Sequence, residues 1–264
     1  MVEKKIIVIT GANSGIGFET GKYLLSKGYK VVGIDLNSTN DLFPIIKCDI
    51  TDYENLGLVF EEIESTYGPI YCLVNNAGIG ISGAIEHTKI NEVEKIFNIN
   101  VVALINACKL IAPILRKNGG GRIINISSVA GEIPIPFQAC YSATKSAVLN
   151  FSMALNLELK DFNIFVSAVL PGDTKTSFTA SRLKNQIMED ENYHDRIKKS
   201  IERMEKDETN GMEPVCVSKV IHKVLRKRKP PVAKTVGLSY KLIIFLSKIL
   251  PRRVMLFIVK KLYG

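Results

Sequence analysis

Two side chains able to exchange a proton, Tyr141 and Lys145, stand four residues apart among small residues. On an α-helix, positions i and i+4 share one face, so the phenol oxygen and the ammonium nitrogen can reach a common point. An ammonium about 4 Å from the phenol, at an effective dielectric constant of about 20, stabilises the phenolate by about 4 kcal/mol. Before the cost of desolvation is subtracted, that energy would bring the pKa of a tyrosine from about 10 to about 7, where it serves as a general acid or base. The same spacing also occurs by chance on solvated helix faces, so the interpretation depends on the rest of the chain.

A glycine-rich turn containing Gly11, Gly15 and Gly17 follows the first predicted strand. Glycines let the backbone approach a pyrophosphate, whose charge is favoured by the amide groups that open the next helix. The second predicted strand ends at Asp35, whose carboxylate can accept hydrogen bonds from a ribose and would repel a phosphate attached there. No Arg or Lys lies in the turn, and Leu36 follows Asp35. These features predict NAD rather than NADP, although Asp35 could also be a solvated carboxylate at a strand end.

The elements that must position these residues are short apolar runs alternating with helical patterns. The predicted strands are 6–10, 31–35, 45–48, 70–75, 122–127 and 164–170, and the predicted helices are 15–27, 52–67, 91–117 and 141–161. Strands that are apolar throughout suit a parallel sheet covered on both faces. The alternation predicts an α/β fold with a doubly wound parallel sheet, the Rossmann fold, which binds ligands at the carboxyl ends of its strands. Only nine residues, 36–44, separate the second and third strands, so we expect no full helix there.

Composition narrows the class of protein. A chain of 264 residues, 46% of them hydrophobic, can form one large α/β domain. Five scattered cysteines without a C-x-x-C pair predict reduced thiols in a cytoplasmic protein, and three widely separated histidines predict no metal site. The segment before the first strand has no apolar signal core, so secretion is not indicated.

Several further motifs appear in a fixed order along the chain. Asn75-Asn76-Ala77-Gly78 follows the fourth predicted strand, Asn100 lies within a predicted helix, and Ser127-Ser128 follows the fifth strand. Tyr141-x-x-x-Lys145 and Pro171-Gly172 complete the order, which resembles the short-chain dehydrogenase/reductase family over roughly residues 4–176. The resemblance implies an NAD-dependent alcohol dehydrogenase or carbonyl reductase that interconverts a secondary alcohol and a ketone or aldehyde. It also implies a homodimer or homotetramer assembled through the helices that begin near residues 91 and 141.

The resemblance implies a role for each catalytic residue. Tyr141 is the acid/base, and Lys145 lowers the pKa of the phenol and donates to the nicotinamide ribose. Ser128, which precedes Tyr141 by 13 residues, binds the substrate oxygen, whereas Ser127 packs nearby. Asn100 holds a water that links Lys145 to solvent. The implied cofactor contacts are Gly11, Asn13, Ser14, Gly15, Ile16, Gly17, Asp35, Asp49, Ile50, Asn76, Ala77, Gly78, Tyr141, Lys145, Pro171, Gly172, Thr174 and Thr176.

Two of these implied roles have alternatives. The Asp49 carboxylate, expected beside the adenine, could also cap the helix that begins near Asp52. Asn100 could also satisfy a kinked helix. For the whole protein, the alternatives are an NAD(H)-binding sensor or scaffold without turnover, and an NADPH-dependent carbonyl reductase.

The C-terminal part differs from the rest in charge. Residues 214–264 contain 13 Lys or Arg and no Asp or Glu, whereas the preceding residues have a net charge of −4. We expect a catalytic domain at 1–236, with a substrate cap at about 174–210, and basic amphipathic helices at 237–264. One face of the first of these helices carries Leu238, Leu242, Phe245, Leu246, Ile249 and Leu250.

These C-terminal helices are too short to span a bilayer. They could lie on anionic lipid as a peripheral membrane contact, cover a hydrophobic substrate, or pack against another subunit. Nucleic acid would leave the apolar face unexplained. We therefore expect an apolar substrate, steroid-like or derived from a lipid, and no nucleic-acid partner.

Overall fold

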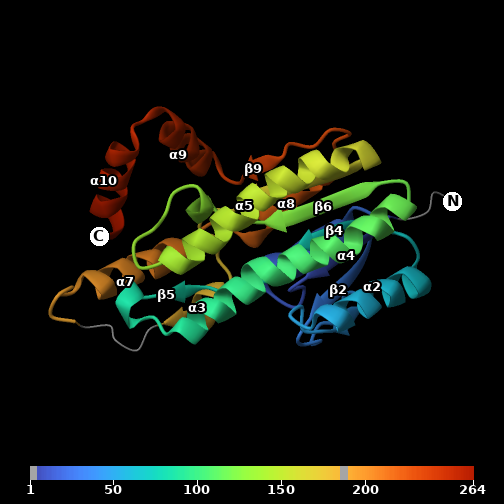
Figure 1. Cartoon of the computed structure of the whole chain (residues 1–264), viewed down its shortest axis with the longest axis horizontal. Helices are drawn as coiled ribbons and strands as arrows, with labels where there is room; N and C mark the ends of the chain where they lie inside the picture. Colours follow the sequence, from blue (N-terminus) through green and yellow to red (C-terminus); the bar gives the residue numbers. More distant parts are fainter. Residues whose placement is uncertain (1–4, 185–189) are drawn as a thin grey trace.

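The computed structural model of this protein describes residues 5–184 and 190–264. These residues form a sheet of seven parallel strands in the order β3-β2-β1-β4-β6-β7-β9 (Figure 1). The strands are β1 (Ile6–Thr10), β2 (Lys30–Asp35), β3 (Ile45–Lys47), β4 (Ile70–Asn75), β6 (Gly121–Ile126), β7 (Ile164–Leu170) and β9 (Ala233–Thr235). The predicted doubly wound α/β fold is confirmed, and the six predicted strands agree with the structure to within one residue at each end. The short strand β9, at the edge beside β7, was not predicted.

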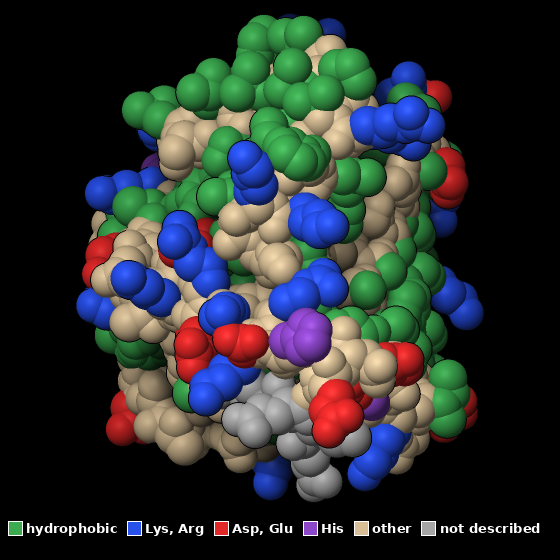
Figure 2. Space-filling model, turned by 90° about the vertical axis from the view of Figure 1, so that its left-hand side faces the viewer, with side chains coloured by type: hydrophobic (Ala, Val, Ile, Leu, Met, Phe, Trp, Pro, Cys, Tyr) green, Lys and Arg blue, Asp and Glu red, His purple; other side chains and the backbone are tan. Residues whose placement is uncertain are grey.

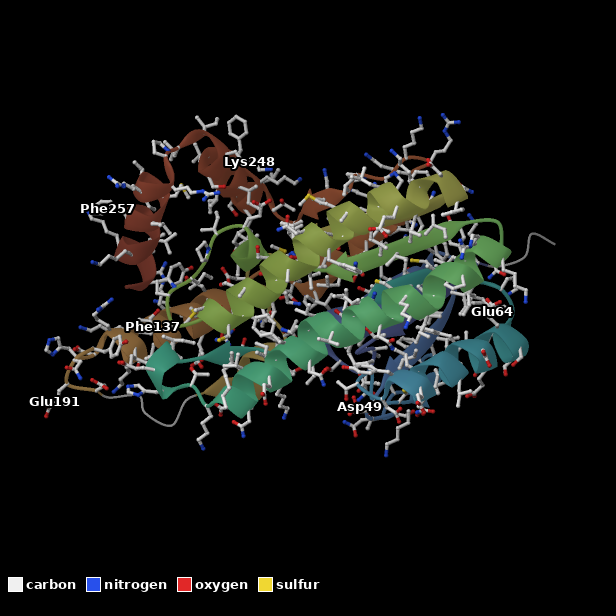
Figure 3. All side chains as sticks on the ribbon, viewed as in Figure 1. Asp49, Glu64, Phe137, Glu191, Lys248 and Phe257 are labelled. Atoms are coloured by element: carbon white, nitrogen blue, oxygen red, sulfur yellow. The ribbon has the colours of Figure 1, made fainter. Side chains whose placement is uncertain are left out.

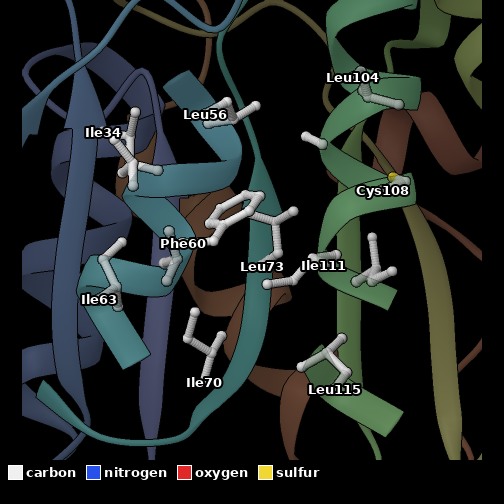
Figure 4. Close-up of a cluster of buried hydrophobic side chains, with 14 of the residues drawn as sticks. Ile34, Leu56, Phe60, Ile63, Ile70, Leu73, Leu104, Cys108, Ile111 and Leu115 are labelled. Carbon is white, nitrogen blue, oxygen red and sulfur yellow. The ribbon is translucent and has the colours of Figure 1, made fainter. Parts of the chain in front are cut away.

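Helices cover both faces of the sheet. On one face lie α1 (Gly15–Ser26) and α8 (Pro214–Arg226), and on the other lie α2 (Tyr53–Tyr67), α4 (Ala103–Lys117) and α5 (Ala139–Leu159). Within β1, Ile6 and Val8 pack towards α2 and α4, whereas Ile7 and Ile9 pack towards α1 and α8. Burial on both faces is the reason that the strands are apolar at every position. Figure 4 shows the first of these clusters, centred on the fully buried Phe60 of α2.

The strand order reverses at β1. The chain moves outward from β1 to β2 and β3, and then returns to place β4 on the other side of β1. Loops that leave neighbouring strands in opposite directions open a crevice at the carboxyl ends, which is where doubly wound sheets bind ligands. The nine-residue connection 36–44 contains no helix, as predicted. Its Phe43 side chain instead covers this part of the sheet, against Gly21 of α1 and Gly33 of β2.

The long helix predicted at 91–117 is interrupted. It consists of α3 (Ile90–Phe97), a π-helical segment (Asn98–Val102) and α4. The extra residue per turn of a π-helical segment lets a side chain be redirected, and here Asn100 is only 1% exposed. Ile90–Lys117 is long and apolar enough to cross a membrane, but α4 packs against β4, β6 and α2 as a core helix does.

The predicted cap and tail fold over the carboxyl ends of the strands. In the described part of the cap lie α6 (Phe178–Ser181), β8 (Leu183–Lys184), which pairs with β5 (Ile81–Ser82), and α7 (Arg196–Thr209). Cap residues 185–189, like residues 1–4 of the predicted domain, lie outside the described residues. The tail forms α9 (Leu238–Ile249) and α10 (Arg252–Tyr263), which bend back towards α5 and α7 (Figure 1). Three short 3-10 helices, η1 (Ile85–His87), η3 (Val129–Gly131) and η4 (Lys160–Phe162), lie in the connections.

The five cysteines are all free thiols. Cys48, Cys72 and Cys108 are buried, Cys140 is half-buried, and Cys216 is exposed. Burial raises the pKa of the Cys108 thiol to about 12, so this thiol stays protonated and unreactive. Three of the five thiols thus lie in the core.

Candidate active site

One cavity of about 720 Å³ lies at the carboxyl ends of the strands. Its wall brings together most of the predicted site residues: Gly11, Ser14, Gly15, Ile16, Asp35, Asp49, Ile50, Asn76, Ala77, Gly78, Ser128, Tyr141, Lys145, Pro171, Gly172, Thr174 and Thr176. Three predicted residues, Asn13, Gly17 and Asn100, are not part of this wall and stand behind it. They hold wall residues in place, as described below.

The glycine turn is clamped against the end of β4. Gly11 has a φ of +64°, and a side chain there would come within 2.9 Å of the Ala77 Cα. A side chain at Gly17 would overlap the Gly11 carbonyl oxygen, so the helix can begin this close to the turn only with glycine. The Asn76 amide donates to the carbonyl oxygens of Thr10 (3.0 Å) and Gly11 (2.9 Å). These contacts fix the backbone that lines the cavity.

The Asp35 carboxylate lies at the same end of the cavity. Its Oδ2 accepts from the Asn13 backbone N–H at 3.0 Å, and its Oδ1 accepts from the Asn37 N–H at 3.2 Å. The Asn13 side chain in turn accepts two hydrogen bonds from Thr39, each of 3.0 Å. Asn13 therefore links Asp35 to the glycine turn and to the loop after β2. Leu36, next to Asp35, is 55% exposed and offers no charge for an additional phosphate.

Asp49 and Asp52 have different structural roles. Asp52 is the N-cap of α2 and accepts from the Asn55 N–H at 3.2 Å. Asp49 lines the cavity, and its Oδ1 accepts from the backbone N–H (2.8 Å) and hydroxyl (2.7 Å) of Thr51. The helix cap is thus Asp52, and Asp49 shapes the turn that precedes it.

Lys145 and Asn100 lie beside each other beneath Gly78. Lys145 is 6% exposed, and its Nζ donates to the Ile126 carbonyl oxygen at 3.0 Å. Asn100 accepts from the Ile79 N–H at 2.8 Å and donates to the Ile79 carbonyl oxygen at 2.9 Å. A side chain at Gly78 would lie 3.0 Å from Asn100 Oδ1 and 3.6 Å from Lys145 Nζ. Asn100 therefore fixes the loop after β4 close to the lysine. The same two hydrogen bonds satisfy the buried Asn100 amide within the π-helical segment.

The two candidate serines, Ser127 and Ser128, make different hydrogen bonds. The Ser127 hydroxyl donates to the Lys145 carbonyl oxygen at 2.7 Å, which ties α5 to β6. Ser128 caps η3, where its Oγ accepts from the Ala130 N–H at 3.1 Å, and it also hydrogen-bonds with the Tyr141 hydroxyl. Ser128 and Tyr141 thus form a pair of hydroxyl groups in the cavity.

Burial dominates the electrostatics of the site. It raises the pKa of Tyr141 to about 12, while the hydrogen bond from Ser128 lowers it. Burial also lowers the pKa of Lys145 to about 8. This differs from a pKa near 7, which one adjacent ammonium would give before desolvation is subtracted, because desolvation is the largest effect on each group and Lys145 Nζ donates to a carbonyl oxygen. At neutral pH the structure holds a protonated phenol.

Two carboxylates close to the phenol were not predicted. Glu208 of α7 and Asp173, after Gly172, both line the cavity and raise the pKa of Tyr141. Asp173 Oδ2 accepts from the Tyr240 hydroxyl at 2.6 Å, across 67 residues of sequence. Sequence reasoning assigned no charged group to the cap, because no local pattern connects α7 or α9 with the end of β7.

The tail helices form the far wall of the cavity. Their lining side chains are Tyr240, Ile243, Leu246, Leu250, Met255, Ile258, Val259, Leu262 and Tyr263. Two tyrosine hydroxyls hold them: Tyr240 donates to Asp173, and Tyr263 donates to Asp207 Oδ2 at 3.1 Å. The arrangement is that of a cover over the cavity. The predicted single apolar face of α9 is divided, since Leu246 and Leu250 face the cavity and the other four residues do not line it.

A second cluster of polar groups lies outside the cavity. Ligand atoms of Glu86, His87 and Asp190 come within 4.8 Å of one another. The His87 Nε2 hydrogen-bonds with Asp190 Oδ2 at 2.8 Å, and its ring packs edge-on against Tyr193. These contacts connect η1 to the described part of the cap.

Residues 5–187 match the model of the short chain dehydrogenase family. The chain belongs to the short-chain dehydrogenase/reductase family. It is 37% identical over 239 residues, 89% of each chain, to the 3-ketodihydrosphingosine reductase of Bacteroides thetaiotaomicron. It is 32% identical over 191 residues, 67% of this chain and 77% of the relative, to the 3-oxoacyl-[acyl-carrier-protein] reductase of Thermotoga maritima.

Solved structures of this family have the same fold. A short-chain dehydrogenase of Streptomyces avermitilis superposes with a TM-score of 0.85 and 26% identity, over 99% of this chain and 98% of the other. The 3-ketoacyl-(acyl-carrier-protein) reductase of Brucella melitensis, complexed with NADH, gives a TM-score of 0.74 and 26% identity over 89% and 98% of the two chains. The resemblance found in the sequence is therefore confirmed. As a short-chain dehydrogenase/reductase, this protein is an oxidoreductase with a nucleotide-binding Rossmann fold.

Proposed function

We propose that this protein is an NAD(H)-dependent oxidoreductase that interconverts a ketone and a secondary alcohol on a long apolar chain. The observation that carries the proposal is the continuity of one cavity, from the glycine turn past Tyr141 to the apolar inner faces of α9 and α10. Such a cavity has room for a cofactor at one end and an alkyl chain at the other. The likeness to a reductase named for 3-ketodihydrosphingosine supports a substrate of this class.

The residues present fit a nicotinamide dinucleotide. The glycine turn and Gly78 keep backbone close to the cavity without side chains that would fill it, and Thr176 stands against Gly15. Asp35 supports NAD(H) over NADP(H), because its carboxylate would accept from ribose hydroxyls and repel a phosphate. When bound, this cofactor supplies or accepts the hydride.

Side chains of the protein would supply the proton that the carbonyl oxygen needs. Tyr141, held protonated by burial, would donate to the carbonyl oxygen as negative charge develops there. Ser128, hydrogen-bonded to Tyr141, would donate to the same oxygen and stabilise its charge. Lys145 carries the positive charge that stabilises the phenolate left behind, and Asn100 holds the loop against which the lysine lies. In the reverse reaction the same phenol would accept the proton from the alcohol.

The proposal is tested by a substrate comparison with the purified full chain. We expect NADH oxidation with 3-ketodihydrosphingosine, and slower or no oxidation with a 3-ketoacyl thioester and a 3-ketosteroid. NADPH should be a poorer cofactor in each assay. Turnover of the thioester or steroid alone would contradict the substrate class. Binding of NADH without turnover of any ketone would favour a sensor and overturn the proposal.

We also propose a homodimer or homotetramer. Large apolar side chains are exposed along the outward faces of the π-helical segment, α4 and α5: Val102, Ile105, Met153 and Leu157. Two copies that join these faces would bury them, as predicted from the helices that begin near residues 91 and 141. Sedimentation of the protein as a monomer at micromolar concentration would contradict this assembly.

A further inference from the structure

We infer that Asp173 is a cation-binding site for the protonated amine of an amino-ketone substrate. The inference deepens the proposed function and rests on it. Asp173 lies at the carboxyl end of β7, in the wall shared by Tyr141 and the tail helices. It is close enough to Tyr141 to act on the phenol electrostatically. A ketone held at Tyr141 therefore has its substituents in a cavity that the Asp173 carboxylate also lines.

Within the described residues the Asp173 carboxylate forms no direct ion pair, and Arg182 and Arg203 act on it only through space, each being paired with another carboxylate. Its hydrogen-bond donor is the neutral Tyr240 hydroxyl, and the same hydroxyl accepts from the Asp173 N–H at 3.1 Å. Burial raises the pKa of this carboxyl, which reflects the cost of holding its charge away from water. A cation bound at Asp173 would offset that cost.

The other carboxylate that acts on Tyr141, Glu208, is different. It is paired with Arg182, whose side chain is 1% exposed, and accepts from the Thr179 hydroxyl at 2.6 Å. The charge of Glu208 is therefore compensated inside the protein. Of the two carboxylates that act on Tyr141, Asp173 is the one without a paired cation.

A carboxylate without a paired cation favours apolar ketones that carry a positive charge. A long-chain 2-amino-3-ketone carries an ammonium next to the carbonyl carbon, so the carbonyl can meet Tyr141 while the ammonium meets Asp173. Its alkyl chain then extends along the apolar inner faces of α9 and α10. A ketoacyl thioester and a ketosteroid have no such cation and would leave the carboxylate buried and unpaired.

The test compares Asp173→Asn with the unmodified protein on two substrates, a 2-amino-3-ketone and the same ketone without the amine. Asparagine keeps the size and an acceptor for Tyr240, but removes the charge. We expect kcat/KM for the amino-ketone to fall at least tenfold, mainly through KM, while the amine-free ketone is unchanged or improved. NADH affinity, measured by fluorescence titration, should stay the same.

Asp207→Asn is the matched control. Asp207 bonds the other anchoring tyrosine of the tail, Tyr263, but does not line the cavity. Its loss should leave the ratio between the two substrates unchanged. An equal loss for both substrates in Asp173→Asn would reduce Asp173 to an anchor of the tail and overturn the inference. If the unmodified protein reduces the amine-free ketone equally well, the inference fails while the proposed function stands; if it reduces neither, the proposed function itself fails.

A second, independent observation concerns the outer face of the tail. Large apolar side chains of α9 and α10 point to solvent, among them Leu238 (83% exposed), Ile249 (62%) and Phe257 (59%). Figure 3 shows Phe257 on the side of α10 that faces away from the sheet. Figure 2 shows the apolar side chains gathered at the top of the molecule, with Lys and Arg around them.

We propose that this outer face binds a surface of anionic lipid. The two helices carry six cationic residues and no Asp or Glu: Lys241, Lys248, Arg252, Arg253, Lys260 and Lys261. Each helix has 12 residues, which is too short to cross a bilayer but sufficient to lie in its interface. Each cation near an anionic surface contributes about 1 kcal/mol. A second copy of this chain is disfavoured as the occupant, because a two-fold contact would bring the same positive charges together.

Flotation of the full chain with vesicles tests this proposal. We expect binding to vesicles of phosphatidylcholine with 30% phosphatidylglycerol, weak binding to phosphatidylcholine alone, and release by salt. The double variant Leu242→Asp/Phe257→Asp changes two exposed side chains that do not line the cavity and should lose binding at least tenfold. The matched control Leu58→Asp alters an equally exposed leucine of α2 and should bind normally. Equal flotation of all variants, or a double variant that changes only the oligomeric state, would overturn the proposal.

Discussion

Lys145 and Tyr141 share one face of α5, with the lysine Nζ 5.7 Å from the centre of the tyrosine ring. The amine donates to the Ile126 carbonyl oxygen at the end of β6, so the sheet fixes its position. The proton donor and the charge that stabilises its conjugate base are thus held by one helix and one strand. Burial keeps the phenol protonated, so Tyr141 can donate a proton while Lys145 stabilises the phenolate.

Replacing Tyr141 with Phe removes the proton donor and little else. The ring contact with Phe178 can remain, since it does not require the hydroxyl. We expect ketone reduction to fall by about 10² to 10⁴. NADH should bind nearly as before in a fluorescence titration. If the variant kept more than a tenth of the turnover in a stopped-flow assay, Tyr141 would not be the acid.

The lowered pKa of Lys145 should make the stability of the protein depend on pH. Burial lowers its pKa from 10.5 to about 8, so between these values the unfolded chain keeps a proton that the folded protein has lost. Stability contributed by this group therefore rises with pH across that window, by at most about 1.4 kcal/mol per pH unit. Below pH 8 both states are protonated, and the full cost of burying the charge remains.

Urea unfolding of the unmodified protein and of Lys145→Met measures this effect. The cysteines and tyrosines titrate in both proteins, so the difference between the two free energies of unfolding isolates the lysine. We expect this difference to move in favour of the unmodified protein by about 1 to 2 kcal/mol from pH 7.5 to pH 9.5. Parallel pH profiles would show that the lysine keeps its proton in the folded state across this range, so that burial does not lower its pKa.

Asp35 should determine the choice between NADH and NADPH. Asparagine removes the charge that repels a phosphate, and its single amide oxygen can still accept one of the two backbone hydrogen bonds, from Asn13 or from Asn37. We expect the ratio of kcat/KM for NADH over NADPH to fall about tenfold in Asp35→Asn, which corresponds to about 1.4 kcal/mol. A preference for NADPH in the unmodified protein would contradict the role given to this carboxylate.

Much of the fold follows from local patterns. The bounds of β1, β4 and β7 agree with the sequence prediction because each is a continuous β-branched or apolar run that ends at polar or turn-forming residues. The glycine turn could likewise be placed, since a strand before it and a helix after it leave one backbone path. By contrast, the three residues of β9 contain no periodic signal, and they become a strand only because the edge of β7 is available.

The chemistry of the site depended more on contacts that are distant in sequence. No pattern around Asp173 indicates that Tyr240 will bond to it, and the pair is brought together only by the return of the tail across the cavity. The pKa of Tyr141 was mispredicted for the same reason, because the walls that desolvate it come from α6, α7 and the tail. Residue types and spacing were sufficient to predict the reacting groups. Their hydrogen-bond partners and pKa values could be seen only in the folded cavity.

Glycine spacing in the turn gives the last prediction. A Cβ at position 17 would overlap the Gly11 carbonyl oxygen and lie 2.6 Å from the Asn76 amide nitrogen, so the first turn of α1 would have to move. We expect Gly17→Ala to lose NADH binding at least tenfold and to destabilise the protein by about 1 to 3 kcal/mol, as overpacking does. Gly57, inside α2, is the control, because a Cβ there meets nothing closer than 3.6 Å. Gly57→Ala should raise the free energy of unfolding by about 0.5 to 1 kcal/mol and leave NADH binding unchanged. Equal effects of the two substitutions, measured by urea unfolding and NADH titration, would mean that the turn does not depend on close contact at Gly17.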